Sequence, residues 1–367
     1  MLNSISTAGQ LTQPRGIVTI NDIQLPWINF EVENNNYYMA DTFHVLMSLT
    51  EMPPEYDVTY WKTIISIYIN IYAGFPPDIT NYSPNNLQNL IYGRVDDITI
   101  DRKTRMISLT GRNLLAEFLD NKTTKKYQNS VSSEVAIELA TSHGLTPIVT
   151  ETDTPVGVYY ENNYSKLTSE QSEWDLLTFL AQQEGFNCFV KGKNFYFQPK
   201  TPLTAKPYVI NYDPEDFDAP YPISNCQELR FNRNLTLAKG LSVTVRGWNS
   251  DENQPFQTTV RSRLRPGRPV GNYQKYEYRQ DGLSPEQILQ YANQKYKELS
   301  QHENKYSIEL PADDILTVEN VIQIIDNEDG TKDVFYPDSI TRRMDFNTGY
   351  TMNITVKNHP TESEVLI

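Results

Sequence analysis

The stretch "VDDITIDRKTRMISLTGRN" (residues 95–113) occurs again in altered form near the other end of the chain, as "PDSITRRMDFNTGYTMNITVKN" (residues 337–358). Both stretches contain Asp-x-Ile-Thr, then a turn, then a strand with alternating apolar residues that closes in Asn. The matched residues are Asp96, Ile98, Thr99 and Asn113 in the first stretch and Asp338, Ile340, Thr341 and Asn358 in the second. Because the matches are few and the hairpins differ in length, two interpretations are open: a duplicated β domain, or a chance likeness of two hairpins.

The same alternation of apolar and polar residues fills both ends of the chain. It predicts strands with one buried face, separated by turns at Asp329-Gly330 and Asn347-Thr348-Gly349. The segments are "TIISIYINIYAGF" from Thr63 (one long strand, with Ile65, Ile67, Ile69 and Ile71 on one face), "RMISLTG" (Ile107, Leu109), "LSVTVRG" (Leu241, Val243, Val245), "KYSIEL" (Tyr306, Ile308, Leu310) and "YTMNITVKN" (Tyr350, Met352, Ile354, Val356).

Two segments have helical periodicity. Between Ser130 and His143, apolar residues fit a short amphipathic helix that Gly144 ends. In "SPEQILQYANQKYKELSQHE", Ser284 is the predicted N-cap and an apolar stripe follows. The stripe consists of Ile288, Tyr291, Ala292, Tyr296 and Leu299. We expect both helices to cover sheets.

A third helix is predicted in "SEWDLLTFLAQQEG" by its capping residues. Ser172 is the N-cap, and Asp175 lies at N3, where its carboxylate can reach back to the cap amide. Trp174 opens the apolar face of the helix, and Gly185 supplies the left-handed residue that ends it. These four residues form a predicted structural cap, followed by an aromatic hairpin that turns at Lys191-Gly192-Lys193.

The same segment raises the alternative of a sugar-cleaving site made of Glu173, Asp175 and Glu184. Such a site needs two carboxyl groups held about 5 to 9.5 Å apart across a cleft, which this spacing does not predict. Capping and the favourable effect of an acid at the helix start explain every acid except Glu184. We therefore interpret the segment as structural.

The order of these elements predicts a mainly β chain with an α+β insertion, in which two barrel-like β domains flank a small α/β module. We predict a first β-barrel domain at residues 1–120 and a module of helix, helix and hairpin at residues 121–205. Residues 206–367 then form a linker and a second barrel domain with the helix 284–301. The linker includes "KTPLTAKPYVINYDPEDFDAPYP", whose prolines favour extended chain.

The composition excludes several classes of function. The 367 residues carry a net charge of -14 and a pI near 4.8, which is unlike proteins that grip nucleic acid over a broad basic surface. Cys188 and Cys226 lie far apart, so neither a disulfide framework nor a zinc site is indicated. The first residues, "MLNSISTAGQ", resemble no signal peptide, and the most apolar run is too short and polar to span a bilayer.

No catalytic or cofactor motif is present in the sequence. The four histidines, His44, His143, His302 and His359, lie in separate segments, and there is no GxSxG or GxxxxGK. Two acidic runs imitate calcium loops. "DPEDFDAP" has no glycine at the sixth place and no glutamate at the twelfth, and "DNEDGTKD" has Gly330 at the fifth place before the strand resumes at Val334. A linker and a hairpin turn are therefore the better interpretations. We expect no cofactor, no metal and no enzymatic activity.

One basic segment stands out in this acidic chain. "RSRLRPGRP" carries Arg261, Arg263, Arg265 and Arg268 within eight positions. A solvated loop is one interpretation. Another is an arm that contacts another subunit or partner, because arginine forms bidentate pairs with carboxylates. Contact with DNA is the third.

Several longer stretches resemble a known family in the family's order. They are "ISLTGRNLLAEFLDNKTTKKYQNSVSSEVAIELATSHGLTP", "SEWDLLTFLAQQEGFNCFVKGKNFYFQP", "ELPADDILTVENVIQI" and "YPDSITRRM". They look like the phage late-control gene D family, the baseplate hub proteins of contractile tails, and like the modules that open the VgrG spike proteins of type VI secretion. The resemblance covers the chain from about Gly93 to Asn358.

The resemblance implies a structural hub in the virion baseplate, made and assembled in the cytoplasm of the bacterial host. It implies a homotrimer whose six similar lobes join a sixfold tail tube to a threefold spike and let DNA pass. The implied partners are a tail tube or tail-terminal ring protein, a central spike protein and baseplate wedge proteins, with a tape measure protein as a further candidate. The chain is not expected to insert into a membrane by itself.

Acidic residues gain a role under this interpretation. Carboxylates that line the ring would repel DNA phosphates, and Asp96, Glu309 and Asp338 are the candidates because they lie opposite the apolar strand faces. VgrG-type chains continue into a needle, and some relatives carry a lysozyme domain. Since this chain stops at Ile367, we expect those parts to belong to separate proteins.

Two alternatives accompany this interpretation. One is the equivalent hub of a phage-derived injection device, such as a tailocin or a secretion system. The other is a carbohydrate-binding receptor module, suggested by the aromatic hairpin with Phe195, Tyr196 and Phe197, although such residues in strands more often pack a core.

Overall fold

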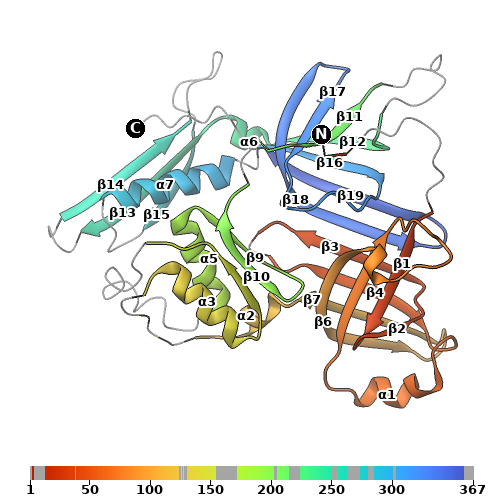
Figure 1. Cartoon of the computed structure of the whole chain (residues 1–367). Coiled ribbons are helices and arrows are strands. Elements are labelled where there is room, and N and C mark those ends of the chain that lie inside the picture. Colours follow the sequence, from red (N-terminus) through yellow and green to blue (C-terminus); the bar gives the residue numbers. More distant parts are fainter. Residues whose placement is uncertain are drawn as a thin grey trace.

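The structure of the chain is a computed structural model (Figure 1). It describes residues 2–3, 13–37, 39–123, 125, 127, 130–153, 172–201, 205–214, 224–249, 254–262, 273–279, 285–300 and 303–358. Within these residues the strands form one 13-stranded sheet and two 3-stranded sheets, and the helices are few, which confirms the predicted mainly β class with α/β parts. The apolar residues that are buried in this described part gather in three clusters.

The N-terminal strands build a curved half of the large sheet, called lobe 1 (Figure 1). They are β1 (Arg15–Ile20), β2 (Ile23–Leu25), β3 (Asn29–Asn35), β4 (Thr42–Ser48), β5 (Tyr68–Gly74), β6 (Gln88–Asp101) and β7 (Met106–Asn113). Between them lie the short helices η1 (Pro54–Tyr56), α1 (Val58–Thr63) and η2 (Pro84–Asn86). The strands are hydrogen-bonded in the order β3-β4-β7-β6-β5-β1-β2. Alternate residues, such as Phe30 and Val32, point into the core, as the sequence pattern predicted.

The C-terminal strands build the other half, called lobe 2. They are β11 (Tyr208–Tyr212), β12 (Glu228–Arg233), β16 (Asn304–Pro311), β17 (Ile322–Asp326), β18 (Thr331–Asp345) and β19 (Gly349–Asn358). Their hydrogen-bonded order is β12-β16-β19-β18-β17-β11. The hairpin turns occur where the sequence indicated, with Gly330 and Gly349 both at a φ of 77°.

The two lobes have the same strand order. Lobe 1 reads β3-β4-β7-β6-β5-β1 and lobe 2 reads β12-β16-β19-β18-β17-β11, and the matched strands also follow one another in the same order along the chain. One pair differs in direction, because β1 and β5 are antiparallel whereas β11 and β17 are parallel. Of the two interpretations of the sequence repeat, this correspondence favours duplication.

Strand pairing also joins the lobes. β3 pairs antiparallel with β18, from Asn35 opposite Ser339 to Asn29 opposite Asp345. This pairing makes the large sheet continuous, and one hydrophobic cluster contains residues of both lobes, including Phe30, Val45, Ile340 and Ile354. The lobes therefore share a core.

An α/β module lies between the lobes in sequence. It consists of α2 (Ala116–Asp120), α3 (Ser132–Ser142), β8 (Thr146–Val149), α5 (Glu173–Glu184), β9 (Phe186–Lys191) and β10 (Asn194–Pro199). β8 runs parallel to β10, which forms the predicted hairpin with β9. The helices pack on this sheet in a cluster of their own, which includes Phe118 of α2 although residues 1–120 were predicted as the first domain.

A second insertion interrupts lobe 2 between β12 and β16. It consists of α6 (Leu235–Ala238), β13 (Leu241–Asn249), β14 (Gln254–Arg261), β15 (Gln274–Arg279) and α7 (Pro285–Ser300). The predicted stripe of α7 packs on this sheet, since Ile288, Ala292 and Tyr296 are buried with Val243 and Val245. The predicted unit 206–367 thus contains two hydrophobic clusters, and the predicted domain boundaries stay predictions. Ser284, the predicted N-cap, lies outside the described residues.

The prediction of a long strand from Thr63 was wrong at its start. Asp57 caps α1 by accepting a 2.8 Å hydrogen bond from the amide of Tyr60, so the chain is helical through Thr63. β5 begins only at Tyr68, and Ile65 is fully exposed although its alternation with Ile67 suggested burial. The predicted linker also contains a buried strand, because β11 pairs with β17.

Candidate functional site

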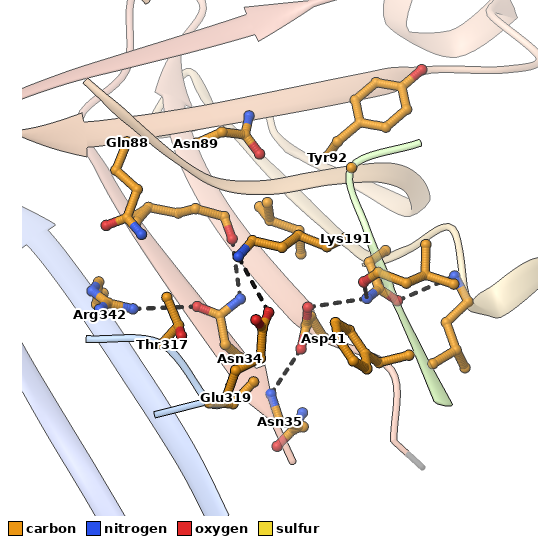
Figure 2. Close-up of a pocket in the computed structure, with 18 of the residues that line it drawn as sticks. Asn34, Asn35, Asp41, Gln88, Asn89, Tyr92, Lys191, Thr317, Glu319 and Arg342 are labelled. Atoms are coloured by element: carbon orange, nitrogen blue, oxygen red, sulfur yellow. Dashed lines mark hydrogen bonds and ion pairs between the residues drawn. The ribbon is translucent and has the colours of Figure 1, made fainter. Parts of the chain in front are cut away.

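A small pocket with polar and apolar side chains in its lining lies where lobe 1, lobe 2 and the α/β module meet (Figure 2). Its cavity of about 60 Å³ is lined by Asn34 and Asp41 of lobe 1, Arg342 and Glu319 of lobe 2, and Lys191 of the module. A cavity of this size accommodates water but is far smaller than the few hundred Å³ typical of a small-molecule site. We interpret this pocket as a joint.

Arg342 connects the two lobes inside this joint. Its side chain is only 2% exposed and donates to the carbonyl oxygens of Asp313 (3.2 Å) and Leu316. It also donates to Oδ1 of Asn34 on β3 (3.4 Å), as Figure 2 shows. A guanidinium has five N–H donors in a rigid plane, so one buried arginine can satisfy several acceptors on different segments.

Asp41 connects lobe 1 to the module. It is half-buried and accepts hydrogen bonds from the amide of Asn35 (2.8 Å) and from Nδ2 of Asn113 (3.0 Å). Asn113 also donates to the carbonyl of Val190 in β9 (3.2 Å). Burial raises the pKa of Asp41 to about 7, although these hydrogen bonds oppose the shift. Lys191 and Glu319 add an exposed ion pair at 3.3 Å between the module and lobe 2.

The candidate acids Asp96 and Asp338 occupy equivalent positions in the two lobes. Each is the extra residue of a β-bulge, between Val95 and Asp97 in β6 and between Pro337 and Ser339 in β18. Asp96 pairs with Arg112 (2.6 Å) and Asp338 with Lys357, and each cation directly precedes the asparagine that closes its hairpin. Asp96 and Asp338 are therefore partly neutralised within their own hairpins.

The hairpins agree in register as well. In lobe 1 the closing Asn113 lies opposite Gly93, and in lobe 2 the closing Asn358 lies opposite Phe335. Gly93 and Phe335 both lie three residues before the bulge aspartate. The residues matched in the sequence thus have matching places in the structure. The two lobes correspond in residue register as well as in strand order, and both observations favour duplication.

The third candidate acid, Glu309, lies on β16, half-buried, directly opposite Glu228 of β12. Asp96 also borders an open groove of about 330 Å³ on lobe 1 with Glu31, Glu33 and Asp97. By the register of the lobes, the corresponding residues of lobe 2 are Arg230, Asn232 and Ser339. At these three positions the outer face is therefore acidic in lobe 1 and not in lobe 2.

The predicted capping residues lie at the two ends of α5. Ser172 and Asp175 form a reciprocal capping box at the start of α5, Trp174 is buried, and Gly185 ends the helix at a φ of 69°. Glu173, considered as a sugar-cleaving acid, instead contacts the ring of His143 on the adjacent helix end. Asp175 is occupied by the cap, and Glu184 lies in the last turn of α5. These acids do not form a pair across a cleft.

The basic arm falls mainly outside the described residues. Arg261 is exposed at the end of β14, whereas Arg263, Arg265 and Arg268 are not described. The proposed contact with a subunit or partner stays a prediction.

The aromatic hairpin does not form a sugar platform. Phe195 and Phe197 are fully buried, and Tyr196 stacks on Phe189 with ring centroids 4.8 Å apart. In the described part of the chain, no group of His, Cys, Asp and Glu residues could hold a metal ion. None of the helices found there is long and apolar enough to cross a membrane. His302 and His359 lie outside that part.

Sequence comparison and fold comparison give different results for this chain. No protein-family model and no curated protein matches the sequence. The fold, in contrast, is similar to that of phage tail proteins and of type VI secretion components. This confirms the resemblance in fold that the sequence suggested.

Three solved structures illustrate the likeness. A tail protein from Neisseria meningitidis MC58 has a TM-score of 0.70 at 11% identity, over 96% of this chain and 98% of that chain. The 43 kDa tail protein of prophage MuSo2 from Shewanella oneidensis has a TM-score of 0.63 at 14% identity, over 94% and 98%. An E. coli component of the type VI secretion system has a TM-score of 0.52 at 9% identity, over 94% and 77%.

Proposed function

We propose that this protein is a structural hub of a contractile phage tail baseplate. It acts as a homotrimer that joins the sixfold tail tube to the threefold spike and surrounds a passage for DNA. The observation that carries the proposal is the duplicated lobe, because three chains with two equivalent lobes each supply six similar units. The likeness in fold to phage tail proteins supports it.

The partners follow from this position. A tail tube or tail-terminal ring protein lies above the ring, a central spike protein below it and wedge proteins around it, with a tape measure protein as a further candidate. The protein is made in the bacterial cytoplasm and resides in the virion baseplate. Its work is mechanical, and the joint at Arg342 and Asp41 supports this role by holding three parts of the chain together.

A hub of a phage-derived injection device is the second candidate. The likeness in fold to a type VI secretion component favours it. The two candidates share the ring and differ in whether DNA passes through it.

Electron microscopy of the purified protein, alone and mixed with its candidate spike protein, tests the proposal. We expect end-on views with threefold symmetry, six lobes and a central hole. Monomers without rings in both samples at every concentration would overturn it. That outcome would favour a carbohydrate-binding module, for which a glycan array is the direct test.

The passage of DNA has its own test. Asp96, Glu309 and Asp338 remain the proposed lumen acids, but removal of Asp96 or Asp338 would also release a cation. Glu33 and Asp97 border the acidic groove and have no ion-pair partner among the described residues, so their variants change charge more cleanly. We expect Glu33→Gln with Asp97→Asn to slow DNA ejection through increased sticking. An unchanged ejection rate would contradict an acidic lumen at this face.

A further inference from the structure

Lobe 1 and lobe 2 are joined by the pairing of β3 with β18, whose register is known. We call this pairing the β3–β18 joint. Val32 of β3 lies opposite Arg342 of β18, and Glu31 lies opposite Arg343. Nε of Arg343 donates to Glu31 at 2.7 Å on the outer face of the sheet. β3 therefore uses one edge to bind β4 and its other edge to bind β18.

The duplicated strands leave the corresponding edges open. β12, the equivalent of β3, ends the large sheet, and its edge away from β16 has no strand partner in the described chain. β6, the equivalent of β18, pairs with β5 only up to Arg94. Its residues 97–101 pair with β7 on one side, and no described strand binds their other side.

From these two open edges we infer a contact between copies of this chain. The inference rests on the proposed trimer and names the surfaces that form it: residues 97–101 of β6 in one copy pair antiparallel with β12 of the next. The pairing repeats the β3–β18 joint, in which the equivalents of these edges already bind each other. An exposed strand edge readily adds another strand through main-chain hydrogen bonds.

The register of the joint predicts the register between copies. Arg112 and Lys357 correspond, since each precedes the closing asparagine, and counting across the ladders matches Val32 with Phe231 and Glu31 with Arg230. Counting from the bulges matches Arg342 with Ile100 and Arg343 with Asp101. Ile100 of one copy then lies opposite Phe231 of the next, and Asp101 opposite Arg230.

The chemistry of these opposed residues is complementary. Phe231 is 53% exposed in the single chain, and Ile100 is half-buried on the same, core-facing side of its strand. Their contact would cover apolar surface that the chain leaves open. Asp101 and Arg230 form an ion pair on the outer face, at the place of the Glu31–Arg343 pair within the chain, with the signs exchanged. The two edges are therefore complementary to each other, so that each copy can bind one neighbour through β6 and another through β12.

This contact is heterologous, because each copy offers two different edges. Such a contact closes into a ring when the rotation between copies fits. If the joint within a chain and the joint between chains have the same geometry, three copies give six equal joints. The β6–β12 pairing therefore accounts for why a trimer can form a ring of six units.

Crosslinking between two variants tests the contact. Both variants carry Cys226→Ser, and Cys188 is retained because it is buried, which raises its thiol pKa and keeps it unreactive. One carries Ile100→Cys, the other carries Phe231→Cys and a mass tag, and the reagent is a short bifunctional maleimide. We expect crosslinked pairs in the mixture and none in either variant alone.

The outcomes separate the inference from the proposed function. Rings in the microscope without a crosslink in the mixture, or crosslinks between identical variants, would overturn the β6–β12 contact and leave the hub proposal intact. No ring in any sample, with or without the spike, would overturn both.

A charge variant gives an independent measurement. Arg230 is exposed, and its ion-pair partner is Glu228 on its own strand, so Arg230→Glu should leave the monomer folded. We expect it to weaken trimer formation at least tenfold, because it places an acid opposite Asp101. Arg246→Glu is the matched control, since Arg246 is also exposed and is paired with Glu277 on the insertion. An equal trimer affinity for both variants, measured by analytical ultracentrifugation, would contradict the proposed register.

Discussion

Lobe 1 and lobe 2 have the same six-strand frame but differ in what the frame carries. At the tip of β3 and β4, lobe 1 has a link of residues 36–41, whereas lobe 2 has the insertion with β13–β15 and α7 between β12 and β16. On the outer face, Glu31 and Glu33 of lobe 1 correspond to Arg230 and Asn232 of lobe 2. The bulge, its ion pair and the closing asparagine are common to both. The hairpin register is therefore the same in both lobes, whereas the loops and the charges on the outer face differ.

The cores of the two lobes are filled in opposite ways. Gly93 and Gly111 of lobe 1 correspond to Phe335 and Val356 of lobe 2. In lobe 1 the ring of Phe43 lies over both glycines, so that a Cβ on Gly111 would lie 2.6 Å from it. In lobe 2 the side chains of Phe335 and Val356 occupy that space, and Tyr306, the equivalent of Phe43, packs edge-on against Phe335. The same volume is filled from different strands.

The largest expected effect concerns the buried arginine. Arg342→Ala removes the donor that satisfies Asp313, Leu316 and Asn34, and the resulting buried acceptors should reduce the free energy of unfolding by about 4 kcal/mol. Its equivalent in lobe 1 is Ile100, whose side chain donates no hydrogen bond. Denaturant unfolding measures the effect, with Arg343→Ala as the neighbouring control, expected below about 1 kcal/mol because its ion pair is exposed. Equal losses would show that burial of Arg342 is not what joins the lobes.

The next effect tests the exchanged packing. A Cβ at Gly111 would lie 2.1 Å from the carbonyl oxygen of Arg94, so Gly111→Ala should force the backbone apart and reduce the free energy of unfolding by about 3 kcal/mol. The reverse change in lobe 2, Val356→Ala, only leaves a cavity and should have a smaller effect of about 2 kcal/mol. Thr110→Ala on the outward face of β7 serves as the control. If Gly111→Ala were milder than Val356→Ala, the close approach in lobe 1 would be refuted.

A pH-dependent effect distinguishes Asp41 from Asn304, its equivalent in lobe 2. Because the pKa of Asp41 is raised from 3.8 to about 7 on folding, its contribution to stability is complete below pH 3.8 and is lost as the pH rises through 7. Relative to Asp41→Asn, the wild type should lose about 3 kcal/mol between pH 5 and pH 8. Thermal unfolding of both proteins across this range measures the difference. A constant difference would mean that Asp41 is charged throughout.

The smallest effect concerns the matched bulge acids. Asp96→Asn and Asp338→Asn each break a partly exposed ion pair, so each should reduce the free energy of unfolding by about 1 kcal/mol or less. The effect should be slightly larger for Asp96, which also contacts Arg94 at 3.3 Å. The same denaturant measurement applies. A loss of several kcal/mol in one lobe alone would show that the two bulges are not equivalent.

Local features of this fold could be predicted from the sequence. The capping box of Ser172 and Asp175, the stripe of α7 and the turns at Gly330 and Gly349 all depend on residues near one another in the chain. The repeat was detectable because its matches have structural causes: an aspartate in each bulge and an isoleucine in the core. The matched cations Arg112 and Lys357 are different residue types, so residue identity alone does not reveal that they correspond.

The candidate site could not be predicted, because it is made of distant contacts. Nothing near Asn34, Asp41 or Arg342 in the sequence indicates that these residues meet at one joint. The pairing of β3 with β18 depends on the curvature of both lobes and on the bulge, which local periodicity does not contain. The predicted start of β5 at Thr63 was also wrong, because the cap at Asp57 favours the helix α1 although the residues after Thr63 alternate as in a strand.

The pairing of β3 with β18 also means that the edge of β3 stays uncovered until late in translation. Glu31 and Arg343, which meet across it, are 312 residues apart in the chain. At roughly 5 to 20 residues per second, the ribosome needs roughly 15 to 60 s to make the strand that covers β3. During that interval the nascent lobe 1 exposes a strand edge that resembles the open edge of β12 in finished copies. Chains translated side by side on one messenger can therefore meet the wrong edge first, and the crowding of ribosomes becomes a determinant of how much correctly assembled protein is obtained.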